Sequence, residues 1–127
     1  MNHKVRGYVF SRPFMGERVP QHVQNLVIRD YCEKNSLYFL LSASEYAMDD
    51  CHLMLSLVLE ELNKIDGIAL YSLFQLPKEI KKRNEIYNTV LEQKKAIYFC
   101  VEGLKLTSKE ERDRVENLWL VKSAMLN

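Results

Sequence analysis

The stretch GYVFSRPFMGERVPQH, residues 7–22, begins as a strand and ends as a helix. Its first four residues are mostly aromatic or apolar, which is typical of a buried strand. Pro20 suits the first turn of a helix, where its missing N–H would have no hydrogen-bond partner in any case. A strand that leads into a helix is the building unit of a parallel α/β sheet. The stretch therefore decides the fold class, provided that the pattern repeats.

The pattern does repeat along the chain. Short apolar runs occupy residues 6–10, 37–42, 67–72 and 96–101, and helical patterns occupy residues 21–35, 51–64, 78–94 and 109–125. The apolar runs do not alternate cleanly with polar residues, which is typical of strands buried on both faces. We expect a single domain, residues 1–127, with an open, mostly parallel four-stranded α/β sheet and helices on both of its faces.

The composition is that of an ordinary globular protein, with 47% hydrophobic residues and a net charge of +1. Nucleic-acid binders usually carry a strongly basic face, so we expect no nucleic-acid partner. Cys32, Cys51 and Cys100 lie far apart, which indicates buried thiols rather than disulfides or a metal site. No apolar run has the length of a signal peptide or a membrane span. We expect a cytoplasmic protein without membrane contact, metal or cofactor.

The loop after the first predicted strand is the best candidate for a binding site. Ligands of open α/β sheets bind beyond the carboxyl ends of the strands. This loop has about ten residues, where two to six are usual, and it contains Arg12 and Arg18. Arginine binds phosphate or carboxylate through paired donors, and the following helix start adds backbone N–H groups. An anion pocket and two solvated surface arginines both fit this pattern.

Other polar residues follow the predicted strands at the same edge. His22 and Glu45 are the acid–base candidates, because histidine titrates near neutral pH and a carboxylate in a crevice can be tuned upward. Ser11 would be a nucleophile only beside a base, and Tyr46 would donate a proton or a hydrogen bond. Each of these residues also has a structural reading. The expected binding residues are Arg12, Arg18, Gln21, Gln24, Ser44, Ser72 and Gln75.

Gln24 is unusual because it lies on the apolar stripe of the first predicted helix, with Val27, Ile28 and Tyr31. An inward-facing glutamine needs a hydrogen-bond partner for its amide. The partner is either a ligand in the crevice or the backbone of the neighbouring loop. For the second predicted helix, we expect Asp49 or Asp50 to be the N-terminal cap.

The last predicted helix, residues 108–125, is apolar around most of its circumference. One apolar face is enough to dock a helix on a sheet, so a second one indicates a second partner. We expect a homodimer through this helix, because most oligomers are symmetric and an identical helix is the simplest partner. The alternative is a helix sunk deeply into its own domain. The contact residues we expect are Leu118, Trp119, Val121 and Met125.

Two segments resemble the catalytic domain of serine recombinases, the resolvases and invertases. GYVFS at residues 7–11, with Gln24, Ile28 and Tyr31 in the following helix, is similar to the family's first strand and helix, and IDGIALYSLFQLPKE at residues 65–79 is similar to its third strand and turn. The resemblance implies a resolvase-like fold with strand order 2-1-3-4, and a dimer through the last helix.

The chain departs from the recombinase pattern at its catalytic positions. The first-strand pattern G-Y-x-R-x-S has arginine where Phe10 stands here, and Ser11 falls one residue early, which points it to the other face. Gln75 and Lys78 replace the two arginines of the third-strand turn, although those cations hold the phosphate charge that develops during cleavage. We also expect no DNA-binding domain after Asn127. From these departures we expect no DNA recombination.

Nearly the whole chain also resembles the sporadic carbohydrate cluster proteins, a small bacterial family from gene clusters for surface-glycan biosynthesis. The similar segments are RGYVFSRPFMGERVPQHVQNLVIRDYC, LLSASEYAM and DGIALYSLFQLP. The resemblance implies a role in making lipopolysaccharide, capsule or a related glycan. We expect an enzyme of undefined reaction type that acts on an anionic sugar or nucleotide sugar. The alternative is a non-catalytic dimeric accessory protein of such a cluster.

Overall fold

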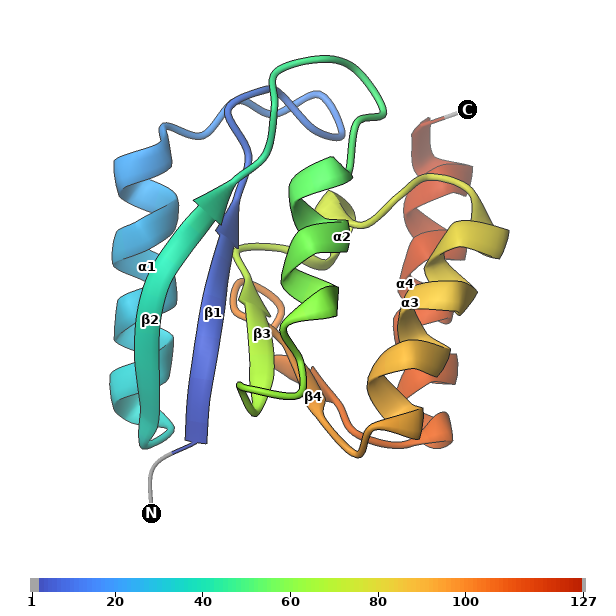
Figure 1. The fold of residues 1–127 in the computed structure, drawn as a ribbon. Coiled ribbons are helices and arrows are strands. Elements are labelled where there is room, and N and C mark those ends of the chain that lie inside the picture. Colours follow the sequence, from blue (N-terminus) through green and yellow to red (C-terminus); the bar gives the residue numbers. More distant parts are fainter. Residues whose placement is uncertain (1–2, 127) are drawn as a thin grey trace.

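The computed structural model describes residues 3–126 of the chain (Figure 1). In chain order the elements are β1 (His3–Val9), α1 (Gln21–Lys34), β2 (Leu37–Ser44), α2 (Leu53–Glu60), β3 (Gly67–Leu70), the short 3-10 helix η1 (Leu73–Gln75), α3 (Ile80–Glu92), β4 (Ala96–Phe99), β5 (Leu104–Leu106) and α4 (Lys109–Leu126). None of the helices in this part of the chain is both long and apolar enough to cross a membrane.

The strands form one sheet in the order β2-β1-β3-β4-β5. The first four are parallel neighbours, which confirms the mostly parallel α/β fold and the expected order 2-1-3-4. β5 is an addition that the sequence pattern did not predict, and it runs antiparallel to β4. The chain reverses between β4 and β5 through Gly103, whose φ is +65°, a conformation that glycine adopts without strain. A strand of three residues is too short to give a periodic signal.

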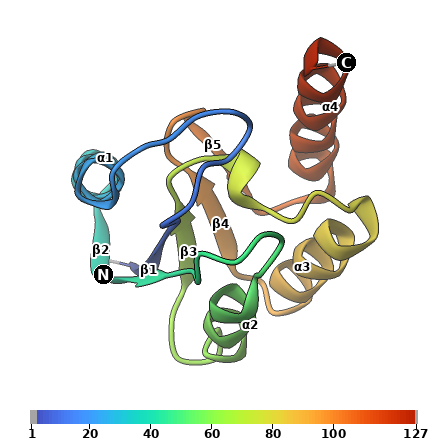
Figure 2. The same cartoon turned by 90° about the horizontal axis from the view of Figure 1, so that it is seen from above.

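The sheet is covered on both faces, as expected. Seen from above, α1 lies on one side, and α2 and α3 lie on the other (Figure 2). Val5 and Val9 of β1 point to the α1 side and pack in a cluster with Ile28 and Cys32. Tyr8, on the opposite face of the same strand, belongs to the larger cluster beneath α2 and α3. Side chains on the two faces of β1 therefore belong to two separate hydrophobic clusters.

β1 and β2 approach each other closely at Gly7. A Cβ atom at this position would overlap Ser42 Oγ and would lie 2.8 Å from Phe39 Cε1. The register of the two strands shifts between Arg6 and Tyr8, which places a bulge in β2 opposite Gly7. The absence of a side chain at Gly7 thus lets the bulged strand stay paired.

α4 is attached to the rest of the protein through Trp119, which corrects one sequence expectation. Trp119 is only 4% exposed, so it is not on a surface that a second copy could contact. Its ring lies edge-on to Phe74 with centroids 5.1 Å apart, and the Arg83 guanidinium lies 4.3 Å above it. Arg83 also forms a bidentate ion pair with Glu116, with both N···O distances 2.8 Å. The other three expected contact residues, Leu118, Val121 and Met125, are exposed.

Candidate functional site

The β1–α1 loop folds back on itself in a narrow turn at the carboxyl edge of the sheet (Figure 1). Phe14 and Glu17 exchange two backbone hydrogen bonds of 2.9 Å. The residues between them, Met15 and Gly16, have φ angles of +50° and +77°, as in a two-residue type I′ hairpin. Phe10 and Phe14 are buried with ring centroids 5.7 Å apart. Apolar packing therefore holds this long loop in place.

Glu45, directly after β2, is 2% exposed and accepts hydrogen bonds on both carboxylate oxygens. Oε1 accepts from Tyr8 Oη at 2.7 Å and from the Leu55 N–H at 3.2 Å. Oε2 accepts from the backbone N–H groups of Tyr46 and Met54 at 3.0 and 3.1 Å. Burial alone would raise the pKa of Glu45, but these donors outweigh burial and hold the pKa below its usual value. The carboxylate therefore caps α2 from outside the helix.

This arrangement replaces the expected cap. Neither Asp49 nor Asp50 caps α2, because the N-cap position is His52, whose side chain makes no capping hydrogen bond. The N–H groups that a cap would satisfy already donate to Glu45. An ionised carboxylate has about four lone-pair sites, and Glu45 fills four with these donors. Its geometry supports a structural role, and the acid–base role remains a prediction.

Gln24 is fully buried, and the loop backbone supplies its partners. Its Nε2 donates to the carbonyl oxygens of Phe10 and Val19 at 2.9 and 2.8 Å. Its Oε1 accepts from the Phe10 N–H at 2.9 Å and from Gln75 Nε2 at 2.8 Å. The amide thus pairs with the backbone beyond β1 as a neighbouring strand would. The loop backbone is therefore a partner of the Gln24 amide, and its role in binding a ligand remains a prediction.

Gln75 and Ser72 form a capping box around η1. Gln75 Oε1 accepts from the Ser72 N–H at 3.3 Å, and Ser72 Oγ accepts from the Phe74 N–H at 3.2 Å. Ser72 Oγ also donates to a carboxylate oxygen of Glu102 at 2.8 Å. Both expected binding residues are buried and bonded within the protein. They shape the turn after β3 instead of facing open space.

Arg12 is the expected binding residue whose charge faces a cavity. Its guanidinium lies 4.1 Å above the Phe10 ring, and Nη1 donates to the Tyr46 carbonyl oxygen at 2.7 Å. Arg12 lines a cavity of about 270 Å³ beneath the loop, together with His52 and Lys78. Among residues 3–126, the side-chain nitrogen or oxygen that is fully buried without a hydrogen-bond partner is Trp119 Nε1. The guanidinium nitrogens of Arg12 other than Nη1 also lack a partner in this part of the chain but are not fully buried. They can therefore donate to a ligand.

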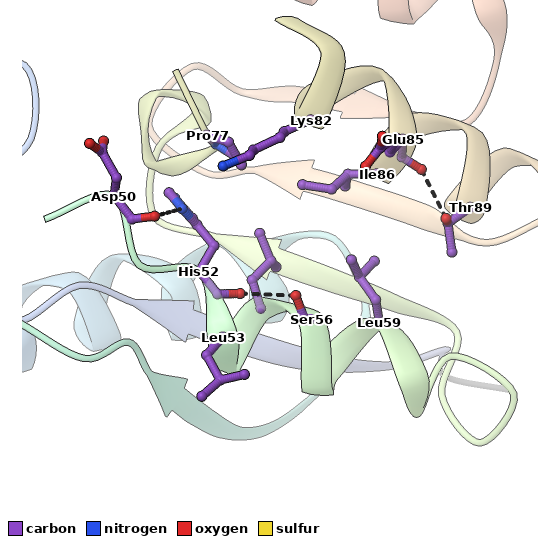
Figure 3. Close-up of a pocket in the computed structure, with 11 residues that line it drawn as sticks. Asp50, His52, Leu53, Ser56, Leu59, Pro77, Lys82, Glu85, Ile86 and Thr89 are labelled. Atoms are coloured by element: carbon purple, nitrogen blue, oxygen red, sulfur yellow. Dashed lines mark hydrogen bonds between the residues drawn. The ribbon is translucent and has the colours of Figure 1, made fainter. Parts of the chain in front are cut away.

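A larger cavity of about 480 Å³ continues from this one between α2 and α3 (Figure 3). Asp50 and His52 line both cavities. The two ring nitrogens of His52 lie 3.0 Å from the Gln75 carbonyl oxygen and 3.3 Å from that of Asp50. Burial lowers the pKa of His52 and outweighs the effect of these carbonyl groups, which raise it. Lys82, on α3, extends toward the end of the cavity where His52 and Pro77 lie (Figure 3).

The other predicted site residues lie outside the Arg12 cavity. Ser11 is exposed, and its Oγ donates to the Glu45 carbonyl oxygen at 3.0 Å. The Tyr46 side chain is 48% exposed. Arg18, His22 and Ser44 are exposed and Gln21 is half-buried, and none of these four is among the residues that line the cavity: Phe10, Arg12, Pro13, Phe14, Met15, Gly16, Asp49, Asp50, His52, Phe74, Leu76 and Lys78. The two loop arginines thus have different environments.

Sequence reasoning missed His52 and Lys78. Lys78 could have been found, because it follows β3 in the turn at the carboxyl edge and ligands bind at that edge. His52 gave no such signal, since a histidine before an apolar helix is an ordinary surface residue. Its place between the two cavities follows from the packing of α2 against the turn that contains Gln75.

No protein-family model matches the chain, and no curated protein sequence matches it either. Solved structures with a similar fold include two catalytic domains or enzymes of the recombinase type. The N-terminal catalytic domain of the TP901-1 integrase is 12% identical with a TM-score of 0.58, over 94% of this chain and 92% of that one. A resolvase family site-specific recombinase from Streptococcus pneumoniae is 6% identical with a TM-score of 0.66, over 96% of this chain and 90% of that one.

These neighbours correct the functional expectations. They are described as a recombinase and an integrase catalytic domain, so the exclusion of DNA recombination and of a nucleic-acid partner is wrong. Nothing in the comparisons supports glycan biosynthesis, an anionic sugar or nucleotide-sugar ligand, or an accessory role in a glycan cluster. The exclusion of a nucleic-acid partner relied on the net charge of the whole chain, which does not describe one edge of a sheet. The exclusion of recombination relied on the departures from the recombinase pattern at Phe10, Ser11, Gln75 and Lys78. The resemblance to serine recombinases is confirmed for the fold: this chain has the α/β fold of resolvase-type catalytic domains.

Proposed function

We propose that this chain binds DNA, with the Arg12 guanidinium as a contact to a backbone phosphate. The observation that carries the proposal is the fixed position of this guanidinium, which stacks on Phe10, donates to the Tyr46 carbonyl oxygen and lines a cavity at the carboxyl edge of the sheet. A planar guanidinium with unused donors suits the paired oxygens of a phosphate. Because the stacking on Phe10 fixes the side chain, binding costs little further ordering.

The fold supports a nucleic-acid ligand over other anions. The two structural neighbours are a site-specific recombinase and the catalytic domain of an integrase. We take residues 1–127 as one domain in the cytoplasm, where DNA is accessible to it. In this chain Arg12 occupies the position that the recombinase pattern G-Y-x-R-x-S gives to serine. A cation at this position would hold the phosphate that approaches the edge of the sheet.

The charges around the cavity predict modest affinity. Lys78 adds a second cation, whereas Asp49 and Asp50 add two carboxylates to the same lining. The site therefore offers one well-placed phosphate contact and no broad basic surface. Binding should weaken with salt in proportion to the few phosphates that are neutralised.

The test is fluorescence anisotropy with a labelled DNA duplex over a series of salt concentrations. Arg12→Ala should weaken binding to all sequences alike and reduce the salt slope by about 1, as expected for one lost phosphate contact. Lys34→Ala is the matched control. It removes one charge from an exposed position at the other end of α1, and it should leave both quantities unchanged.

Equal affinity of the Arg12→Ala and Lys34→Ala variants would refute the phosphate contact, and binding that is absent at low salt would refute the function. Thermal unfolding of each variant checks that the fold is intact. The same mixtures on a denaturing gel show whether bound DNA is cut. A Ser11→Ala variant then assigns any cut to the Ser11 hydroxyl.

A further inference from the structure

The outer edge of β2 is unusually open for a strand of its length. β2 pairs with β1 on one side, and among residues 3–126 no strand pairs with its other side. The eight residues LYFLLSAS contain no charge, proline or glycine. Native proteins usually protect an edge strand by making it short, by charged or proline residues, or by a covering segment. β2 is irregular at the bulge opposite Gly7, which the register of its ladder with β1 defines.

Apolar side chains flank this unpaired backbone. Leu41 is 75% exposed and Tyr38 is 56% exposed. Beside them, a cavity of about 290 Å³ between β2 and α2 has a mostly apolar lining that includes Leu41, Ala43 and Leu57, and the ion-paired Arg6 and Glu61 also line it. Leu57, on α2, is itself 47% exposed. A free strand edge beside a mostly apolar groove is the surface used in strand addition, where the backbone supplies hydrogen bonds and the side chains fill the groove.

We propose that β2 pairs with β2 of a second copy of this chain, antiparallel about a twofold axis, so that two sheets become one. The unpaired N–H and C=O groups along β2 require a binding partner that is itself an extended strand. The absence of charge in β2 favours its own copy, because like charges that would repel across a symmetric pair are missing. A twofold axis also brings the same apolar side chains of both copies together.

The bulge defines which part of β2 pairs. Arg6 Nη1 already donates to the Leu41 carbonyl oxygen at 2.9 Å, so this group is not available to a second strand. The register with β1 is regular from Leu37 to Leu40, where each residue has one partner in turn. The segment Leu37–Leu40 is therefore the part that forms the new ladder. Tyr38 lies within it, and Leu41 lies at its end.

The test measures self-association by sedimentation velocity over a range of protein concentrations. A Tyr38→Lys, Leu41→Lys variant places like charges across the twofold axis and should raise the dissociation constant at least about tenfold. The matched control is Leu120→Lys, Met125→Lys on α4. It adds the same charge at similarly exposed positions, 71% and 76%, and it should leave association unchanged.

Hydrogen exchange identifies the surface independently. The amides of residues 37–40 should become more protected as the protein concentration rises, and this gain should be absent in the β2 variant. Three results would overturn the proposal: a monomer at every concentration, association lost only in the α4 variant, or β2 protection that does not depend on concentration. None of these results depends on whether the chain binds DNA.

Discussion

Tyr8 Oη donates a hydrogen bond of 2.7 Å to Glu45 Oε1, and both residues are buried. Tyr8 lies on β1 and Glu45 follows β2, so this bond joins neighbouring strands at the edge that carries the candidate site. Burial and the neighbouring carboxylate raise the pKa of the Tyr8 phenol, which therefore stays protonated and remains a donor. The carboxylate in turn holds the start of α2.

Glu45→Gln should destabilise the protein by about 2–4 kcal/mol, because the amide nitrogen would face N–H donors and leave buried groups without partners. Urea unfolding monitored by circular dichroism measures the change. Glu33→Gln, at an exposed position on α1, is the control and should change the free energy of unfolding by less than about 0.5 kcal/mol. If the two variants were equally stable, Glu45 would have no capping role.

The stabilisation by Glu45 should disappear in acid. The pKa of its carboxyl is lowered by folding, so the unfolded chain binds the proton more readily. Its contribution is fully present above the unfolded pKa of about 4.3 and is lost as the pH falls through the folded pKa. The difference in unfolding free energy between the wild type and Glu45→Gln should therefore shrink below pH 4. A difference that is constant from pH 7 to pH 3 would contradict this assignment.

Gly7→Ala should cost about 1–3 kcal/mol, because the added methyl group would overlap Ser42 Oγ and crowd Phe39. Removing the obstacle should recover part of the loss. The double variant Gly7→Ala, Ser42→Gly should be more stable than the sum of the two single changes predicts, and urea unfolding of all four proteins measures this coupling. Strict additivity would show that the bulge does not depend on the small residue at position 7.

Removing only one partner of the ion pair between Arg83 and Glu116 should strongly lower the free energy of unfolding. Glu116→Leu leaves the buried Arg83 without its carboxylate and should destabilise the protein by about 3–5 kcal/mol. Arg83→Met combined with Glu116→Leu should cost less, because no unpaired charge remains buried. The exposed pair Lys34–Asp30 is the comparison, and Asp30→Asn should cost less than about 1 kcal/mol. A double variant as unstable as Glu116→Leu would refute this reasoning.

Much of the fold could be predicted because the four parallel strands are short apolar runs separated by amphipathic helices. The predicted bounds differ from those found mainly at the strand ends. β1, for example, starts at His3 because Lys4 and Val5 pair with β2, although their sequence alone gives no strand signal. β5 escaped prediction because its three residues form a strand only through pairing with β4.

The site was harder to predict because its polar residues find partners far away in the chain. Arg12 and Arg18 look alike in the sequence, yet the Phe10 ring and the Tyr46 carbonyl oxygen fix only the first. The sequence predicted Trp119 to lie on an exposed apolar surface, whereas in the structure it packs against Phe74 and Arg83. Pairings of this kind depend on the tertiary structure and leave no local pattern.

The amide pair of Gln24 and Gln75 has a consequence for the order in which the protein is made. These residues are 51 positions apart, and together with the Phe10 backbone they close the edge that carries Arg12. A growing chain on the ribosome cannot form this edge until Gln75 has been synthesised and has left the exit tunnel, however early β1 and α1 take shape. Contacts between such distant residues form late in folding. The edge that carries Arg12 should therefore form only after most of the chain has been translated.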